Sequence, residues 1–385
     1  MMENFVLQMP VPYYFGRNQI VHLEEISSQF QRILLVYGGG SILKNGIYDD
    51  VLSHCRGQIT QFCGIESNPS IETAARGVQA ARQNHCDAIV AVGGGSVIDA
   101  AKAIAAGVYW EGDLWNMVLH ADQIRKALPL IAVPTAAATG SEFNSTSVIS
   151  NGKLVQKKGF SNPVLFPAAC IADPSYTFTV PPRQTRAGAA DTMSHILEDY
   201  FKPGFDAPIA DGISEVLLRT VMEALTTVLR DPMDYAARAD LLYASDIGIK
   251  SLTAYGKSGM WSCHSISHAL TAHYGVNHGE SLAVITPFWM DQVLNETTVL
   301  RFDQFARNVF GFHDPDLMTN GRNSIEALRS FWHESGLPGR LRELGIEDPA
   351  GLSEIARELH ATRDYSKSFV NLTLEDLETI LTRAW

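Results

Sequence analysis

The chain has 385 residues, of which 46% are hydrophobic and 19% charged, and its formal net charge is −12. This length and composition indicate a globular protein large enough for two domains. The acidic balance argues against a surface for nucleic acid or for an anionic membrane. We therefore expect a small molecule as the partner, with no nucleic acid and no membrane.

The N-terminal segment and the cysteines predict a cytoplasmic protein. Residues 1–8 lack the basic region and the apolar stretch of a signal peptide. No apolar run approaches the roughly 20 residues of a membrane span. The five cysteines are scattered and form no CxxC motif, which favours reduced thiols in the cytoplasm.

Three short apolar runs, at residues 32–37, 88–92 and 130–134, predict buried strands. Each run stops at a loop of small residues, and helical stretches separate the runs. Continuous apolar strands that alternate with helices indicate an α/β fold whose parallel sheet is covered on both faces. Ligands bind such sheets in the crevice at the carboxyl ends of the strands.

The texture of the sequence changes at Pro181-Pro182, after which β-like runs largely vanish. We predict an α/β dinucleotide-binding domain at residues 1–182 and an all-helical, metal-binding domain at residues 183–385. The active site is expected in a cleft between these domains. The helical patterns that follow the prolines span residues 187–200, 213–229, 235–252 and 262–272, with more towards the C-terminus.

The glycine-rich loop that begins at Gly93 follows a predicted strand and opens a predicted helix. Glycines there let the backbone approach a pyrophosphate closely, and the helix N-terminus supplies free N–H groups and a favourable dipole. Ser96 adds a hydroxyl. The alternative is a tight turn without a ligand, but three consecutive glycines exceed what a turn requires. The loop is not the GxGxxG fingerprint, so an ordinary Rossmann domain is not predicted.

A second glycine loop, Gly38 to Lys44, bears on the choice of nicotinamide nucleotide. An NAD site usually places a carboxylate where the chain reaches the adenosine ribose, and this loop contains no acidic residue. Ser41 and Lys44 suit a 2′-phosphate, which an acid would repel. We therefore predict that NADP(H) is favoured over NAD(H). The alternative for Lys44 is a solvated surface side chain.

Two segments of the helical half have the spacing of metal ligands. Asp191 and His195 are four residues apart, and so are His264 and His268, which puts each pair on one face of a helix. With His278 they offer one carboxylate and at least three imidazoles, which suit Zn²⁺ or Fe²⁺. Either pair alone is more often a surface or core feature, but an ionised Asp on an apolar face needs a partner. Together the segments predict a catalytic metal held between helices.

Several motifs in combination resemble the iron-containing (group III) alcohol dehydrogenases, and the resemblance spans nearly the whole chain. In texture the chain is most similar to the NADPH-dependent butanol dehydrogenase or aldehyde reductase branch of that family. The motifs are Gly93-Gly-Gly-Ser-x-x-Asp99, Pro134-Thr-x-x-x-Thr139-Gly-Ser-Glu142, Asp191-x-x-x-His195 and His264-x-x-x-His268, followed by His278-Gly279.

The resemblance implies a dehydroquinate-synthase-like fold and one divalent metal, Fe²⁺ or Zn²⁺, with Asp191, His195, His264 and His278 as its ligands. It also implies a homodimer or a larger homo-oligomer. The position of His268 is not a ligand in the family but lies near the nicotinamide and the substrate. The alignment passes a hairpin expected near residues 151–152. The implied nucleotide contacts are Gly38, Gly39, Gly40, Ser41, Asn68, Gly94, Gly95, Ser96, Asp99, Thr135, Thr139, Ser141, Asn144, Lys157 and Tyr176.

The implied reaction is reversible hydride transfer between NADP(H) and small primary alcohols or aldehydes, with the metal polarising the substrate oxygen. His268 is our candidate catalytic residue, as a proton relay to solvent. A role in orienting a metal ligand is the alternative.

Three other functions are weighed against this one. A dehydroquinate-synthase-like lyase needs several basic residues near the metal, yet residues 252–288 contain only Lys257 as a Lys or Arg. Oxidation of polyols, as in glycerol dehydrogenases, differs mainly in the polarity of the pocket. A regulatory protein that binds metal or nucleotide has no need of an open coordination position.

Glu280 departs from the pattern of many relatives and places a charge close to His278. We expect its side chain to face solvent; the alternative is an effect on substrate or metal preference. Tyr255, Trp261, Phe143 and Trp115 are candidates for an apolar substrate wall, although such residues are more often core.

Overall fold

The computed structural model describes residues 2–204, 207–249 and 252–385, which form two compact units. The first, called the sheet unit below, consists of Gln8–Pro181 and Asp231–Asp246. The second, the helical unit, consists of Pro182–Arg230 and Ile247–Trp385 together with the residues that precede Gln8. The division into functional domains at residue 182 stays a prediction.

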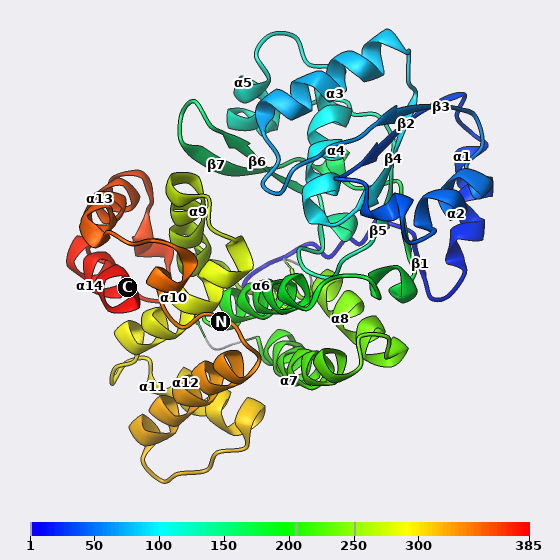
Figure 1. Ribbon diagram of the computed structural model, residues 1–385. Helices are drawn as coiled ribbons and strands as arrows, with labels where there is room; N and C mark the ends of the chain where they lie inside the picture. The colour runs from blue at the N-terminus through cyan, green and yellow to red at the C-terminus, as the bar shows by residue number, and fades with distance from the viewer. Residues whose placement is uncertain (1, 205–206, 250–251) are drawn as a thin grey trace. The chain divides into compact units, whose positions relative to one another are not determined.

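The sheet unit is built on a six-stranded sheet, counted over the described residues (Figure 1). Its strands lie in the order β1-β8-β5-β4-β2-β3, and each neighbouring pair is parallel. Their bounds are β1 Tyr13–Phe15, β2 Arg32–Tyr37, β3 Gln58–Phe62, β4 Ala88–Gly93, β5 Leu130–Pro134 and β8 Ala169–Ala172. The predicted parallel sheet is therefore confirmed, and β2, β4 and β5 are the strands that the sequence predicts.

Helices cover both faces of this sheet, which explains the continuous apolar runs of its central strands. Leu34 of β2 belongs to the core beneath α3, α4 and α5, whereas its neighbour Ile33 belongs to the core beneath α1 and α2. Figure 1 shows these two groups of helices on opposite sides of the sheet. Their bounds are α1 His22–Ser27, α2 Ile47–His54, α3 Ile71–Gln83, α4 Gly95–Gly107 and α5 Leu114–Leu119.

A hairpin and a later helix complete the sheet unit. β6 (Thr146–Asn151) pairs antiparallel with β7 (Gln156–Ser161), which confirms the expected hairpin. α8 (Tyr235–Ile247) buries Leu242 against β8, and so this helix belongs with the sheet although it follows α7 in the chain. The sequence predicts this helix to residue 252. It ends five residues earlier, and residues 250–251 of that prediction lie outside the described residues.

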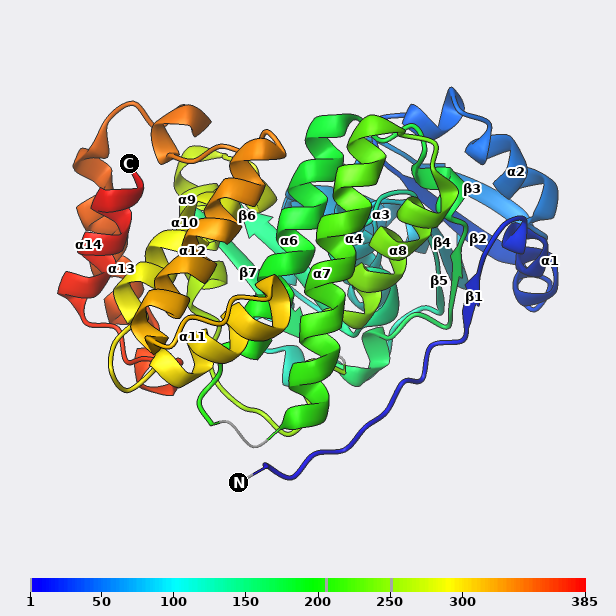
Figure 2. The same ribbon diagram turned by 90° about the horizontal axis from the view of Figure 1, so that it is seen from below.

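The helical unit is a bundle in which α10 packs against α6, α9, α12 and α14. Figure 2 shows α6 and α7 side by side. None of the helices in the described part of the chain is both long and apolar enough to cross a membrane. The bounds are α6 Pro182–Tyr200, α7 Pro208–Arg230, α9 Ser262–Tyr274, α10 His278–Val293, α11 Val299–Phe305, α12 Leu317–Glu334, α13 Leu352–Thr362 and α14 Leu374–Ala384.

Candidate metal centre and nucleotide loops

Three helices of the helical unit bring the predicted metal ligands together. α6 carries Asp191 and His195 one turn apart, in the stretch of the helix that is buried throughout. Pro182 begins this helix. An N–H at the first position of a helix has no partner within the helix, so a proline, which lacks the N–H, loses no hydrogen bond there. His264 lies in the first turn of α9, and His278 is the first residue of α10.

A short connection joins α9 to α10, and each helix is capped where it meets this connection. Gly275 ends α9 in the left-handed conformation at φ 68°, which glycine adopts without strain. Asn277 caps α10, and its side chain accepts a hydrogen bond from the N–H of Glu280 at 3.1 Å. The chain therefore reverses at once, and His278 returns to the side of His264.

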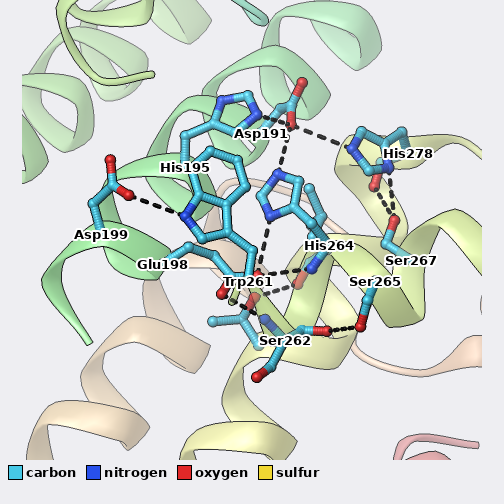
Figure 3. Close-up of polar contacts among 12 residues, drawn as sticks. Asp191, His195, Glu198, Asp199, Trp261, Ser262, His264, Ser265, Ser267 and His278 are labelled. Carbon is cyan, nitrogen blue, oxygen red and sulfur yellow. Dashed lines mark hydrogen bonds and ion pairs between the residues drawn. The ribbon is translucent and has the colours of Figure 1, made fainter. Parts of the chain in front are cut away.

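The ligand atoms converge on the carboxylate of Asp191 (Figure 3). Its Oδ1 lies 3.4 Å from Nε2 of His195 and 3.7 Å from Nε2 of both His264 and His278. The rings of His195 and His264 stack with centroids 4.6 Å apart. His268 lies beside this group rather than in it, with its ring centroid 4.9 Å from that of His278.

This arrangement fits a divalent metal. One atom each of Asp191, His195 and His264 lies within 4.8 Å of the others, and all three residues are buried. Nε2 of His264 is buried and makes no hydrogen bond within the described residues. His278 is not in that group of three, although its Nε2 lies 3.7 Å from Asp191. Imidazole nitrogens together with a carboxylate are the donors that Zn²⁺ and Fe²⁺ accept.

The surroundings of His264 also change the pKa of its imidazole. Burial lowers the pKa of the His264 imidazole, but the neighbouring carboxylates of Asp191 and Glu198 outweigh this, so the net shift is upward. A metal takes the neutral imidazole. We therefore expect metal binding at this site to release protons.

Two outer contacts of the ligands were not anticipated from the sequence. Glu198 of α6 lies 3.2 Å from Nδ1 of His264, and Oγ of Ser267 lies 2.7 Å from Nδ1 of His278. Spacing is the only sequence signal for either residue. Glu198 is two turns after Asp191, and Ser267 is three residues after His264, so each shares a helix face with a ligand.

Trp261 covers one side of the ligand group, and its own position is fixed by a buried acid. Its ring centroid lies 4.7 Å from that of His264 and 5.4 Å from that of His195. Its Nε1 donates to Oδ1 of Asp199 at 3.0 Å. Of the residues proposed for an apolar wall, Trp115 is instead buried in the core beneath α3 and α4.

The expectation that Glu280 faces solvent is wrong. Its side chain is buried and accepts two hydrogen bonds from Arg183 of α6, at 2.6 Å to Nε and 2.7 Å to Nη2. This pairing is possible because α10 approaches α6 closely. A Cβ on Gly279 would lie 2.0 Å from the carbonyl oxygen of Ala187.

The predicted nucleotide loops lie at one edge of the sheet in the sheet unit. The register pairs Tyr37 with Val92 and Gly93 with Pro134, so the ends of β2, β4 and β5 lie side by side. The glycine loop after β2, the N-terminus of α4 and Thr135 all follow these ends. The structure thus brings these predicted residues to the edge where parallel sheets bind ligands.

The N-terminus of α4 has no room for side chains on its glycines. A Cβ on Gly93 would lie 2.5 Å from the side chain of Val97, and one on Gly95 would lie 2.1 Å from Oγ1 of Thr139. Ser96 lies within this helix, while the loop of Thr139 lies against its first turn. The glycines therefore allow the loop of Thr139 to pack closely on α4. They also leave the backbone there uncovered by side chains of their own.

Three predicted nucleotide contacts take part in a buried polar cluster around Lys102. Its Nζ donates to the carbonyl oxygens of Ser141, Asn144 and Thr146, at 2.6, 2.7 and 2.8 Å. Oγ of Ser141 donates to Asp99 at 2.6 Å. Asp99, Ser141 and Asn144 thus shape the loop from inside, and their predicted contact with a nucleotide is not shown by these bonds.

Other predicted contacts have partners outside that cluster. Nζ of Lys157 donates to Oδ1 of Asn68 at 2.9 Å, which brings those two residues together. The hydroxyl of Tyr176 donates to Asp50 at 3.2 Å. Ser41 is exposed in a short 3₁₀ turn after Gly40.

Comparison with known proteins gives matches over nearly the whole chain. Residues 10–174 match the model for iron-containing alcohol dehydrogenase, and residues 185–385 match the model for the C-terminal part of the Fe-containing alcohol dehydrogenase family. NADH-dependent butanol dehydrogenase A of Clostridium acetobutylicum is 41% identical over 350 residues, covering 90% of each chain. NADPH-dependent aldehyde reductase YqhD of Escherichia coli is 33% identical over 351 residues, again covering 90% of each.

A solved structure shows the same likeness in three dimensions. The crystal structure of NADH-dependent butanol dehydrogenase A from Thermotoga maritima superposes with a TM-score of 0.94 at 36% identity. The match covers 100% of this chain and 99% of that one.

Proposed function

Because this chain belongs to the iron-containing alcohol dehydrogenase family, we propose that Asp191, His195, His264 and His278 hold its divalent metal. The chain is an NAD(P)-dependent oxidoreductase of the alcohol dehydrogenase and aldehyde reductase class. Its proposed reaction is reversible hydride transfer between the nucleotide and small primary alcohols or aldehydes. The observation that carries the assignment is the convergence of three buried or half-buried imidazoles on Oδ1 of Asp191.

Each protein group has a separate part in this reaction. A bound divalent metal supplies a Lewis acid for the substrate oxygen, and a bound nicotinamide nucleotide supplies or accepts the hydride. Asp191 and the three histidines orient that site, and the ring of Trp261 keeps water from one side of it. The protein contributes no nucleophile.

His268 is proposed to move the proton that the alcohol gains or loses. It lies one turn after His264 on α9 and is half-exposed, with its ring next to that of His278. An imidazole in this position can pass a proton through its two ring nitrogens between the buried ligands and solvent.

The preference for NADP(H) is a finer proposal that rests on the loop after β2. Ser41 and Lys44 are exposed there, and no acid occurs between Tyr37 and Tyr48. Relatives differ, because the butanol dehydrogenases compared above are named NADH-dependent and the aldehyde reductase NADPH-dependent. A cytoplasmic location and a homo-oligomeric state stay predictions as well.

The surroundings of Lys257 weigh against the lyase alternative. This residue is buried, and its Nζ is 2.6 Å from Oδ1 of Asp211 and donates to the carbonyl oxygen of Asp199 at 3.1 Å. The one Lys or Arg of residues 252–288 is therefore committed to the helical unit's own structure. A polyhydroxylated phosphate would find no Lys or Arg from this segment.

The test is turnover of butanal by protein that is first stripped of metal and then given Fe²⁺ or Zn²⁺. Oxidation of NADPH or NADH is followed by its absorbance. We expect turnover that requires metal and that falls by more than about 100-fold in His264→Ala, because even outer contacts of ligands change activity 10–100-fold. His273→Ala is the matched control, because His273 is an exposed histidine of the same helix, paired with Glu358.

Two results would overturn parts of the proposal. Metal-independent turnover, or full activity in His264→Ala, would contradict the metal site. Turnover with NADH alone would leave the site standing and contradict the preference for NADP(H).

A further inference from the structure

Glu198 connects two of the three helices that carry the proposed metal ligands. It lies one turn after His195 on α6, and its carboxylate meets the N-terminus of α9. Oε2 accepts a hydrogen bond from the N–H of Ser262, and Oε1 accepts one from the N–H of His264, both at 2.8 Å. The same Oε1 lies 3.2 Å from Nδ1 of His264. Figure 3 shows this carboxylate below the His264 ring, on the side away from Asp191.

These contacts fix which nitrogen of His264 faces the other ligands. An ionised carboxylate only accepts hydrogen bonds, so Nδ1 of His264 must donate the proton. The lone pair is then left on Nε2, which lies 3.7 Å from Oδ1 of Asp191. A ligating histidine needs that tautomer, and a carboxylate on its other nitrogen also raises its basicity.

The same carboxylate fixes the place of α9 against α6. The first N–H groups of a helix have no partner within the helix, and Glu198 accepts from two of them. A negative charge at a helix N-terminus is also favourable to the helix dipole. Glu198 is buried, so water does not replace these bonds if the carboxylate is changed.

His278 has a weaker outer partner. Its Nδ1 meets the hydroxyl of Ser267 at 2.7 Å, and that hydroxyl also lies 2.5 Å from Oγ of Ser281. A hydroxyl carries no charge and can act as donor or acceptor, so it directs the tautomer less strongly than a carboxylate does.

We propose that Glu198 is a positioning residue for the metal site, which sets both the tautomer of His264 and the distance of α9 from α6. The inference rests on the metal site proposed above. It adds a residue that acts through His264 and not by contact with substrate or metal. Ser267 has the corresponding and smaller role for His278.

Glu198→Gln tests this proposal with almost no change of shape. Three donors point at the carboxylate, and an amide has an acceptor on only one side. Whichever way the amide turns, its NH₂ faces a donor. If the NH₂ faces His264, two donors point at each other, because the ligating tautomer of His264 carries its proton on Nδ1.

The measurement is the dissociation constant for Zn²⁺, obtained by competition with a chelator, on metal-stripped full-length protein. Visible absorption of the Co²⁺-substituted protein reports the coordination geometry. We expect Glu198→Gln to weaken binding by about 10–100-fold and to alter the Co²⁺ spectrum. Ser267→Ala should weaken binding less.

Glu215→Gln is the matched control. Glu215 is also a buried glutamate of the helical unit, and it accepts hydrogen bonds from Tyr200, Gln304 and Asn308 at 2.8, 3.0 and 2.8 Å. It contacts none of the proposed ligands, so its amide variant should bind Zn²⁺ as the unchanged protein does.

The outcomes separate this inference from the proposed function. Tight Zn²⁺ binding that is equal in the unchanged protein and in Glu198→Gln would overturn the inference alone. Failure of the unchanged protein to bind would overturn the metal site itself. If Glu198→Gln does not fold, nitrogen NMR of the Zn²⁺-loaded unchanged protein decides the matter. A proton on Nδ1 of His264 supports the proposal, and ligation through Nδ1 contradicts it.

Discussion

Asp191 in the helical unit and Asp99 in the sheet unit are both buried acids next to predicted binding residues. Asp99 accepts a hydrogen bond from Ser141 at 2.6 Å and lies beside the buried Lys102, which the surrounding carbonyls hold in place. Asp191 instead meets three imidazoles at 3.4 to 3.7 Å, which is longer than a hydrogen bond.

This difference indicates separate roles for the carboxylates of Asp99 and Asp191. Burial raises the pKa of Asp99, whereas Lys102 and Ser141 lower it, with a net value of about 6. The fold therefore supplies the counter-charge itself. Around Asp191 the fold places three imidazoles. Asp99 therefore shapes a loop, whereas Asp191 is proposed to bind a metal.

Removing the cation of the sheet unit should have the largest effect on stability. Lys102→Met leaves the buried Asp99 without its neighbouring cation, and it leaves three carbonyl oxygens without their donor. We expect the free energy of unfolding to fall by about 3–5 kcal/mol, as for other buried pairs that lose one partner. Urea denaturation measures this, with the exposed Lys153→Met as the control. A loss equal to that of the control would contradict the structural role of the Lys102 cation.

Removing the metal from the helical unit should have the next largest effect. At a metal concentration of about 100 times the dissociation constant, binding to the folded state alone contributes about 2.7 kcal/mol. Thermal unfolding with metal or with chelator measures the shift. The metal-dependent shift should disappear in Asp191→Asn. It should persist in any folded variant whose substitution lies in the sheet unit. A shift that survives in Asp191→Asn would contradict the role of this carboxylate.

The contact of α10 with α6 can be tested at Gly279. An added Cβ would meet the carbonyl of Ala187 at 2.0 Å, so Gly279→Ala must push α10 away and carry His278 with it. We expect a loss of about 1–3 kcal/mol in unfolding free energy and weaker metal binding. Gly212→Ala is the matched change, because that helical glycine has nothing within 4 Å of its added Cβ. It should be neutral or stabilising by up to about 1 kcal/mol.

The smallest effect is expected at the ion pair of Arg183 with Glu280. The Arg183 side chain is 75% exposed, so water can take over much of its role when it is removed. We expect Arg183→Met to cost about 1 kcal/mol or less. A double-mutant cycle with Glu280→Gln measures the coupling. A large loss of metal affinity in Arg183→Met would instead link this pair to His278.

The sequence predicts the strands β2, β4 and β5 because their apolar runs are buried on both faces of the sheet. It does not predict β1, which has only three residues, or β3, whose side chains are half-buried or exposed. Such short or mixed runs gain their strand structure from pairing with β8 and β2, which local patterns do not contain.

The site residues differ in the same way. Asp191 and the histidines can be proposed from the sequence because two segments with the helical spacing of metal ligands occur in the same chain. Glu198 looks like any helix acid until the N-terminus of α9 lies against it. Glu280 looks solvent-exposed until Arg183, almost a hundred residues earlier in the chain, pairs with it. Both depend on helix packing that spacing does not encode.

A crystal of the protein loaded with Zn²⁺, measured at the zinc absorption edge, tests the metal site most directly. We expect one strong anomalous peak at about 2.0–2.2 Å from Asp191 oxygen and from Nε2 of His195, His264 and His278. A peak elsewhere in the helical unit, or none at this place in zinc-saturated crystals, would contradict it.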